Sequence, residues 1–474
     1  MARTDLPARE QPGDFSGGTS GWTWGERAAL VLGALLRLAL PVAAWLVSRD
    51  LSVFHSPDDS YLLIASALLR GEGFSLDGVP ELVRTPGYPV FLAPGVLAGA
   101  VEPLTVFLQA IAGTITVGLV IAVTKGLTSS RRASVAAGFA YAVEPLAIVY
   151  TSKLSTESLF AMFLMLAALI LQRSLRRDSW TDLVGGAVAL SLAAYVRPIG
   201  YFLPVVTTAT WLVVAAVGKP VSRVVLARVA VFLAVTMSVL GLWQTRNFLA
   251  AGYSRFSAVT DLALYAYHGA AVQAAVEGAS YYDVRDRMLL EAESSRDSAP
   301  SQGAYYRSLG IVGERLVASR PWVFLSTYLK GVMRVALDPG GIEYLKLFGV
   351  YPQSGGLLGV IVDKGVLSAI LQLFRDQPGA LLVMGLLGLL LGLYWVMAAV
   401  GAGIVVRERP LRVDAALMLA WPAYLILVSG GPAALDRFRH PAMPFVAVLV
   451  GLAAEGIEPV WRRLGRALGR NLPQ

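Results

Sequence analysis

Long apolar stretches separated by short polar loops dominate the chain. A membrane-spanning helix needs about 20 mainly apolar residues, and fewer where neighbouring helices fix its ends. Two charged segments, Trp322–Leu337 and Val360–Phe374, either cross as well or form re-entrant or interfacial helices. The pattern predicts an all-α polytopic membrane protein with about ten to twelve transmembrane helices. The ten clearest stretches are Ala28–Val47, Leu104–Val123, Ala133–Tyr150, Leu159–Leu171, Leu183–Val196, Ile199–Val217, Val224–Thr245, Gly379–Val406, Ala415–Val428 and Pro441–Ala454.

Polar segments divide the chain into parts. We expect residues 1–25 to form a disordered cytoplasmic N-terminus, residues 26–458 the transmembrane domain, and residues 459–474 a basic cytoplasmic tail. Within the membrane domain, residues 49–103 form a first outward loop, and residues 246–378 form a second outward loop with interfacial or re-entrant helices. No small-residue cleavage site follows the first apolar stretch, so we interpret it as a retained helix.

Composition and charge agree with this membrane assignment. Charged residues make up 15% of the chain, against about 25% in soluble domains, and hydrophobic residues make up 56%. The net charge is +8, and Lys and Arg concentrate in alternate short loops, whereas acidic residues outnumber basic ones in residues 49–103. The positive-inside rule therefore places both termini in the cytoplasm and the acidic loop outside, with no nucleic-acid partner needed. The absence of cysteine excludes disulfides and thiolate metal sites.

The first outward loop contains two adjacent carboxylates. Asp58 and Asp59 follow Pro57 at a helix-start signal, and the apolar residues after them share one helical face. We expect a short amphipathic helix along the membrane surface, with this face formed by Tyr61, Ile64, Ala65 and Leu68. The carboxylates are either a helix cap with a solvated neighbour or a general base at the membrane–water boundary, and both can hold for the same residues.

Further charges recur at outward ends of predicted helices. Arg84 precedes a Pro-Gly-Tyr-Pro bend, where a guanidinium suits either a substrate phosphate or a lipid headgroup. A charge at a helix end near the membrane surface costs little free energy, so each of these residues alone has a structural explanation. Their convergence, however, suits an anionic, membrane-held substrate. Glu144 and Arg37 lie deeper, where they either pair between helices or, for Glu144, line a cavity. The other outward charges are Glu157, Arg197, Arg246, Arg437, Arg439 and His440.

The second outward loop is rich in tyrosine. Tyr305, Leu309, Val312 and Leu316 have the spacing of an amphipathic helix. Tyr265, Tyr267 and His268 either stack against a sugar or pack in the protein, and we favour packing. The three histidines lack metal-ligand spacing, so no metal site is predicted, and a divalent-cation requirement stays open. No phosphate-binding loop and no nucleophile elbow are present.

Taken in chain order, these motifs resemble the polytopic C-type (GT-C) glycosyltransferases that use polyprenyl-phosphate sugars. The similarity is to bacterial relatives of the protein O-mannosyltransferases and of the lipid A aminoarabinose transferase, over roughly residues 28–455. The residues that carry it are Asp58-Asp59, Arg84–Ala93, Ser155-Thr156-Glu157, Arg197-Pro198, Arg246-Asn247, and Arg437-Phe438-Arg439 with Pro441.

The resemblance implies roles for these residues. Asp58 resembles the catalytic Asp, with Asp59 in the following acidic position, and either one is the base. Glu157 matches a second acidic position and is counted with the catalytic residues. The candidate cavity-lining residues are Arg197, Arg246, Tyr61, Glu144 and His268. Arg84 occupies the place of a basic residue on the lipid phosphate, and Arg437 and Arg439 match a basic motif before the last helix. The implied partners are a polyprenyl-phosphate sugar donor, an extracytoplasmic glycan, lipid or protein acceptor, and the lipid bilayer of the plasma (inner) membrane.

The chemistry also fits the residue types. A sugar on a lipid phosphate already carries a good leaving group, so one carboxylate base near the surface suffices to activate the acceptor, and direct displacement inverts the anomeric carbon. A transporter or lipid flippase is the alternative, and it predicts charges near mid-membrane and a repeat across the two halves. A non-catalytic envelope protein would need no clustered carboxylates.

Overall fold

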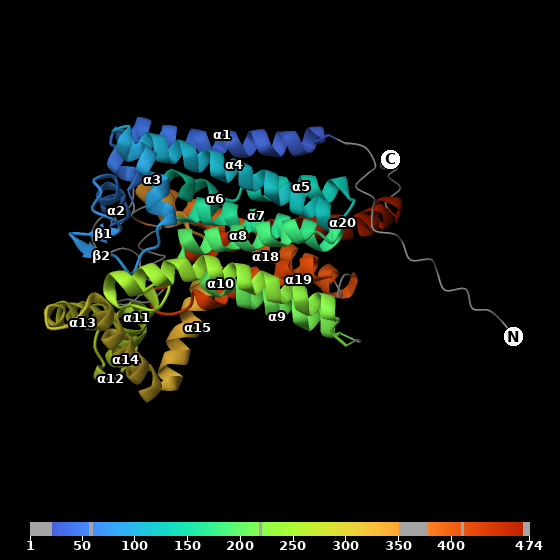
Figure 1. The fold of residues 1–474 in the computed structure, drawn as a ribbon. Helices are drawn as coiled ribbons and strands as arrows, with labels where there is room; N and C mark the ends of the chain where they lie inside the picture. Colours follow the sequence, from blue (N-terminus) through green and yellow to red (C-terminus); the bar gives the residue numbers. More distant parts are fainter. Residues whose placement is uncertain are drawn as a thin grey trace.

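The computed structural model describes residues 21–55, 60–217, 220–349, 375, 378–408 and 412–467. Figure 1 shows a bundle of helices that run side by side, with the remaining elements gathered at one end, here called the loop end. The long helices of the bundle are α1 (Trp24–Ser48), α4 (Val101–Leu127), α5 (Arg131–Ala142), α7 (Glu157–Arg177), α8 (Trp180–Val196), α9 (Leu203–Ala216), α10 (Arg223–Ala251), α18 (Pro378–Glu408), α19 (Val413–Val428) and α20 (Met443–Ala467).

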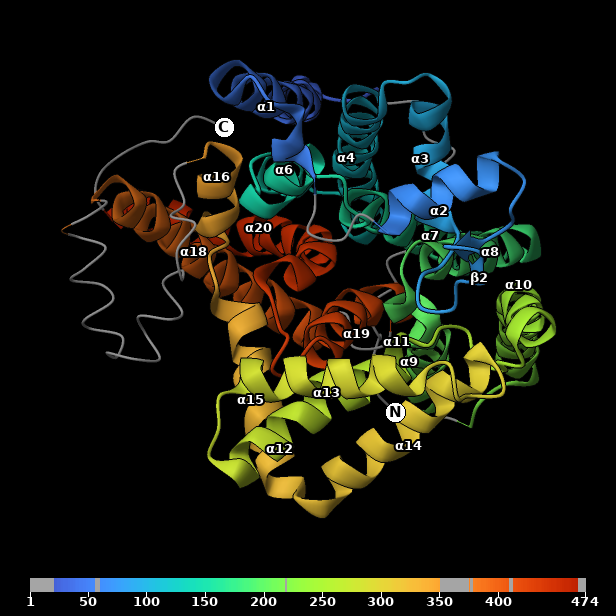
Figure 2. The same ribbon diagram turned by 90° about the vertical axis from the view of Figure 1, so that its left-hand side faces the viewer.

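The shorter elements connect these helices or cover the loop end (Figure 2). In the first part of the chain they are η1 (Leu51–Phe54), α2 (Ser60–Leu69), β1 (Ser75–Leu76), β2 (Val79–Pro80), α3 (Gly87–Leu97), α6 (Pro145–Val149), η2 (Tyr150–Ser152) and η3 (Pro198–Phe202). In the second part they are α11 (Val259–Ala263), the π-helical turn η4 (Leu264–Gly269), α12 (Ala270–Glu277), α13 (Tyr281–Ser295), α14 (Gln302–Ser319), α15 (Pro321–Leu337), α16 (Gly341–Leu347) and η5 (Asp436–Ala442).

The predicted all-α polytopic membrane fold is confirmed, since each of the ten predicted stretches falls on a helix or on consecutive helices. Within the described residues, six helices are long and apolar enough to cross a membrane, and the bent pair α5–α6 makes a seventh. Helices α8 and α19 have only 17 and 16 residues, yet they run in the same direction as the long helices of the bundle (Figure 1). Exposed leucines such as Leu386, Leu389 and Leu393 on α18 give the bundle an apolar outer surface.

The two extra predicted crossings have different outcomes. Trp322–Leu337 forms α15, which lies across the end of the bundle rather than along it (Figures 1 and 2), so the interfacial alternative describes it better. Val360–Phe374 lies outside the described residues. Two expected boundaries also shift: α1 already begins at Trp24 behind a Thr23 cap, and α10 continues to Ala251, so Arg246 belongs to a helix end rather than to the second loop.

At the end of the bundle opposite the loops, ion pairs of buried acidic residues connect the helices. Glu26 of α1 is fully buried and accepts hydrogen bonds from Lys125 Nζ and Ser134 Oγ, each over 2.8 Å. Asp414, at the start of α19, pairs with Arg412 over 2.7 Å and with Arg176 over 3.4 Å. Because breaking a buried pair leaves an uncompensated charge, these contacts hold the helices together at this end.

The α5–α6 span is bent by 53° at a break in the helix. Two charged side chains form hydrogen bonds with backbone groups at this break. Arg37 of α1 is fully buried and donates from Nη1 to Ala142 O and from Nη2 to Tyr141 O, both over 3.1 Å, at the carboxyl end of α5. Glu144 caps α6 by accepting from Ala147 N over 2.5 Å. A cation at one helix end and an anion at the next helix start match the two helix dipoles, and both side chains supply hydrogen bonds to backbone groups at the break.

The first loop folds as predicted at its helix and adds a hairpin. Helix α2 begins at Ser60 and buries Ile64 and Ala65. The strands β1 and β2 pair antiparallel around Asp77-Gly78, both of which have positive φ. An Asp-Gly pair is the common sequence for such a two-residue turn.

The second loop forms a small helical unit with its own apolar core. Tyr265, Met288, Tyr305 and Leu309 belong to this core, which confirms packing for Tyr265 and the predicted helix at Tyr305, now seen as α14. The unit lies at the loop end beside α15 (Figure 2).

Candidate active site

A buried carboxylate with two arginines lies at the loop end of the bundle. Glu157 is the first residue of α7 and is 1% exposed. Its Oε1 accepts from Arg197 Nη1 over 2.9 Å and lies 4.0 Å from Arg437 Nε. Both guanidiniums also lie over the ring of Phe438, each 5.2 Å from its centroid. Two arginines around one carboxylate leave an excess positive charge that favours an anionic ligand.

Local sequence explains why these side chains meet. The N-terminal end of α7 favours a negative charge at Glu157, and Thr156 Oγ1 donates to Glu157 Oε2 over 3.3 Å. Arg197 precedes Pro198, which ends α8 and directs the chain back across its end. Arg437 comes from η5, the turn between α19 and α20. Three distant helix ends thus converge, as the sequence pattern indicated.

A chain of polar and aromatic contacts connects this cluster to the first loop. Tyr88 of α3 donates its hydroxyl to Gln109 Oε1 over 2.8 Å. Gln109 Nε2 in turn donates to the carbonyls of Thr151 and Lys153, over 2.9 and 2.7 Å, in the segment that leads into α7. On its other side Tyr88 meets the edge of Tyr61, with ring centroids 5.2 Å apart.

Arg84 is the last residue of this chain of contacts and belongs to the first loop. Its guanidinium is 5.2 Å from the centroid of the Tyr61 ring, and its Nε donates to Ser60 Oγ over 3.2 Å. The structure therefore brings Arg84 and Tyr61 together at the start of α2. Asp58 and Asp59 directly precede Ser60 in sequence and lie outside the described residues.

The two arginines of η5 have different surroundings. Arg437 faces Glu157, whereas Arg439 is 1% exposed and turns toward α15. Arg439 Nη1 donates to the carbonyls of Val335 and Asp338, both over 2.7 Å. One end of its guanidinium is committed to backbone carbonyls, whereas Nε is buried with no hydrogen-bond partner among the described residues, so donor-phosphate binding by Arg439 stays a prediction.

Behind the cluster lie polar residues of η2 and η5. Tyr150 donates its hydroxyl to Asp436 Oδ1 over 3.4 Å, and burial, with the charges of Asp338 and Glu343, raises the pKa of Asp436 to about 6. His440 is fully buried, with its ring 6.2 Å from that of Tyr150. Burial lowers the pKa of His440 to about 3, so this imidazole is neutral at physiological pH.

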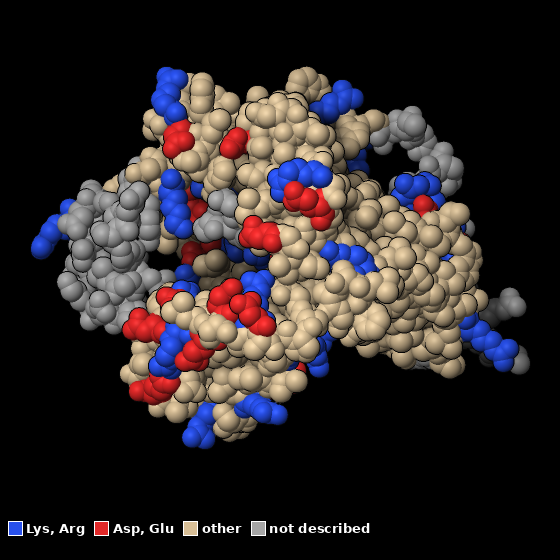
Figure 3. Space-filling model, turned by 60° about the vertical axis from the view of Figure 1, so that its left-hand side comes forward, with Lys and Arg blue, Asp and Glu red and all other residues tan. Residues whose placement is uncertain are grey.

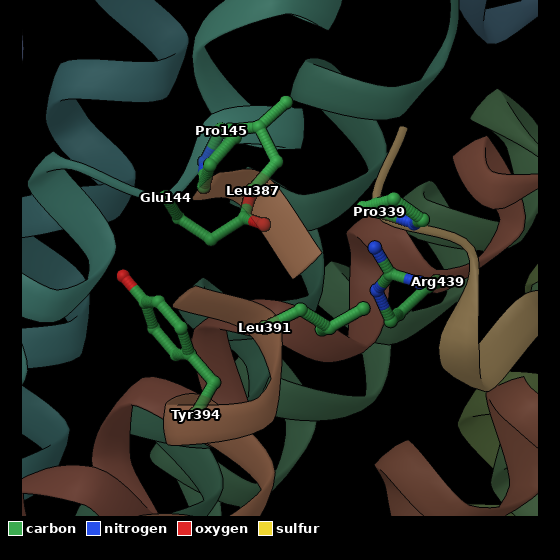
Figure 4. Close-up of a pocket in the computed structure, with 7 residues that line it drawn as sticks. All are labelled: Glu144, Pro145, Pro339, Leu387, Leu391, Tyr394 and Arg439. Atoms are coloured by element: carbon green, nitrogen blue, oxygen red, sulfur yellow. The ribbon is translucent and has the colours of Figure 1, made fainter. Parts of the chain in front are cut away.

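A small pocket lies beside Arg439 (Figure 4). The carboxylate of Glu144 and the guanidinium of Arg439 face each other across it. Glu144 thus caps α6 and borders this pocket, which is the cavity-lining position, the second of the two alternatives expected for it. The residues around the pocket are Glu144, Pro145, Pro339, Leu387, Leu391, Tyr394 and Arg439.

Arg246 and His268 contact other parts of the loop end. Arg246 Nη1 donates to Glu81 O over 2.8 Å and its Nη2 donates to Phe74 O, so this residue holds the β1–β2 hairpin. His268 lies against the rings of Phe324 and Tyr328, at centroid distances of 5.5 and 5.8 Å. Burial lowers the pKa of His268 to about 4, which fits the favoured packing role.

Figure 3 shows a hollow at the loop end, with acidic and basic side chains on its rim. Among the described residues, no group of three or more His, Asp or Glu side chains could hold a metal ion.

Comparison with known proteins gives a family match over part of the chain and solved structures with a similar fold. Residues 86–243 match the family of dolichyl-phosphate-mannose-protein mannosyltransferases. The Archaeoglobus fulgidus oligosaccharyltransferase AglB, in complex with an inhibitory peptide and a dolichol-phosphate, is 14% identical, with a TM-score of 0.51 over 95% of this chain and 52% of that chain. Its apo form is 15% identical, with a TM-score of 0.52 over 96% and 54%. The resemblance to the GT-C glycosyltransferases is confirmed.

At these identities the archaeal structures show a shared fold, and the present chain spans about half of their length. ArnT from Cupriavidus metallidurans, bound to undecaprenyl phosphate, is 14% identical over 93% of this chain and 80% of that chain, with a TM-score of 0.37. No curated protein matches the sequence.

Some residues of this candidate site were missed from the sequence. Gln109 and Tyr88 received no role, although a glutamine inside an apolar helix signals a polar contact in the protein interior. Asp436 and Tyr150 were also missed. Their signal is weaker, because an acid beside arginines at a helix end reads as an ordinary surface charge.

Proposed function

We propose that this chain is a membrane glycosyltransferase that moves a sugar from a polyprenyl-phosphate donor to an extracytoplasmic acceptor. The observation that carries the proposal is the buried Glu157–Arg197–Arg437 cluster and its connection to Arg84 through Tyr61, Tyr88 and Gln109. These charges lie together at the loop end, and Asp58 and Asp59 directly precede in sequence Ser60, which Arg84 contacts. The family match and the shared fold support the same reaction class.

The cationic residues suit different parts of the reaction. Arg197 fixes the Glu157 carboxylate, and we assign the donor phosphate to Arg84 and Arg437. A guanidinium binds phosphate through paired hydrogen bonds and stabilises the charge that develops on the leaving oxygen. The lipid tail needs an apolar surface, which the outer face of the bundle supplies.

The reaction we propose is a direct displacement. The acceptor hydroxyl or amine loses a proton to the carboxylate of Asp58 or Asp59 and attacks the anomeric carbon. The bond between that carbon and the phosphate oxygen breaks, and polyprenyl phosphate leaves with the electron pair. One displacement inverts the anomeric configuration, and the base contributes about 10²–10⁴-fold.

The loop end faces the extracytoplasmic side in this proposal. Both long loops lie at one end of the bundle, and the start of α1 and the end of α20 lie at the other (Figure 1). The basic short loops fall at that second end, which the positive-inside rule assigns to the cytoplasm of the plasma (inner) membrane.

The experiment uses purified protein in liposomes that contain radiolabelled polyprenyl-phosphate mannose, the sugar that the family description names, with a mixture of envelope glycans and lipids as acceptor. We expect label to leave the polyprenyl phosphate and join an acceptor covalently. A flippase would move the intact donor between leaflets without cleaving it, and that result would reject the transferase.

A further inference from the structure

Arg439 caps the end of α15 although it is about a hundred positions away in the chain. Its Nη1 donates to Val335 O over 2.7 Å, to Ala336 O over 3.4 Å and to Asp338 O over 2.7 Å. The last carbonyls of a helix have no partner within the helix, and a cation there also matches the helix dipole. Arg439 is therefore a clamp between η5 and α15.

Helix α15 is fixed to the same stretch of chain at a second place. The Tyr328 hydroxyl donates to Leu427 O over 2.7 Å, and Gly431 N donates to Tyr328 O over 3.2 Å. Gly331 approaches the Gly431 backbone so closely that a Cβ on Gly331 would lie 2.1 Å from Gly431 O. Only glycine allows this approach, so α15 lies directly on the turn that leads into η5.

The clamp ends two residues from the candidate phosphate ligand. Arg437 and Arg439 lie on opposite sides of one short 3-10 helix, with Arg437 toward Glu157 and Arg439 toward α15. A tight turn cannot shift one residue without shifting its neighbours. Release of Arg439 from α15 would therefore move Arg437 relative to Glu157.

We propose that Arg439 is a positioning residue: by clamping η5 to the end of α15, it holds Arg437 at the distance from Glu157 that donor binding requires. This inference rests on the proposed function, because it assigns Arg437 to the donor phosphate. In this proposal Arg439 acts on the donor through Arg437, not by binding the phosphate itself.

The kinetic test compares R439Q and R439K with wild type in the mannosyl-transfer assay. We expect R439Q to raise the donor KM about tenfold, with a smaller change in kcat and an unchanged acceptor KM, because a phosphate contact made in the ground state is misplaced. Lysine keeps the charge but lacks the planar fork, so R439K should recover part of the affinity. Wild-type donor KM in both variants would overturn the proposal.

R412Q is the matched control. Arg412 also donates to two helix-end carbonyls, Leu127 O over 3.1 Å and Gly126 O over 3.2 Å, but at the opposite end of the bundle. We expect R412Q to lower thermal stability and leave the donor KM unchanged. A raised donor KM in R412Q would mean that any lost clamp has this effect, and the specific role of Arg439 would be rejected.

A second measurement does not depend on transfer. The chain has no cysteine, so L435C provides a single spin-label site on an exposed residue just before η5. We expect the label to become more mobile in L435C/R439Q and L435C/R439K than in L435C or L435C/R412Q. Unchanged mobility would reject the clamp even if wild type showed no transfer, whereas increased mobility without transfer would reject only the proposed function.

Discussion

Arg197 donates from Nη1 to Oε1 of Glu157 over 2.9 Å, across 40 positions of the chain. This pair joins the end of α8 to the start of α7, and Arg437 approaches the same oxygen from η5. A buried carboxylate between two guanidiniums stabilises the protein only while both partners stay in place, because loss of a partner leaves a buried charge unpaired. The arrangement gives a fixed site with excess positive charge.

We expect E157Q to lower mannosyl transfer at least about 100-fold, because the amide no longer holds the two arginines by charge. The assay is initial-rate transfer by purified protein in liposomes, normalised to folded protein. E26Q is the matched control, since Glu26 is also a buried, ion-paired acid but lies at the opposite end. Equal transfer by E157Q and E26Q would contradict a role for Glu157 in the reaction.

We expect R84Q to raise the donor KM about 10- to 100-fold, because a charge-assisted hydrogen bond is worth roughly 1.5–3 kcal/mol. R84K keeps the charge but not the fork, so its KM should lie between R84Q and wild type. The measurement is a titration of labelled donor at saturating acceptor. Arg70, an exposed arginine of the same loop that pairs with Glu72 over 2.6 Å, provides the control R70Q, which should match wild type. Equal KM values for R84Q and R70Q would remove Arg84 from the donor site.

The apolar pattern predicted the bundle well, because burial in lipid fixes helix length and polarity. It also placed Glu157, Arg197 and Arg437 together, since charges at outward helix ends converge wherever those ends meet. The Asp77-Gly78 hairpin could have been predicted from its turn pair.

The split between Arg437 and Arg439 could not be predicted in the same way. Two arginines that are two positions apart are equivalent in sequence, and only the path of η5 and the place of α15 direct one to Glu157 and the other to Val335 O. The place of Arg246 on the hairpin depends likewise on how α10 meets the first loop.

We expect R37M to destabilise the protein by about 3 kcal/mol, because buried carbonyls at the end of α5 lose their donors and each unsatisfied group costs roughly 1–3 kcal/mol. Thermal unfolding in detergent measures this change. R173Q is the control, since Arg173 is half-exposed and lies 3.8 Å from Asp182, a pair worth little. If R37M and R173Q unfold at the same temperature, the break between α5 and α6 does not need a buried cation.

The buried Asp436 should make stability depend on pH. Burial raises its folded pKa from an ordinary value near 3.8 to about 6. Between these values the folded state holds a proton that the unfolded state has lost, so its contribution to stability is full below pH 4 and falls as the pH rises to 6. The loss is on the order of 3 kcal/mol.

Thermal melts of wild type and D436N from pH 4 to pH 7 measure this contribution. The decline in melting temperature between pH 4 and pH 6 should be smaller in D436N, because the amide does not titrate. The same decline in both proteins would show that the Asp436 carboxyl is not the group responsible.

In the proposed reaction a first-loop carboxylate removes the acceptor proton in a single displacement. The most direct measurement is transfer of labelled mannose from polyprenyl-phosphate mannose by wild type, D58N and D59N, with the anomeric configuration of the product determined. We predict an inverted product from wild type and a loss of about 100-fold or more in one of the two variants. Full transfer by both variants, or a product that retains the donor configuration, would contradict it.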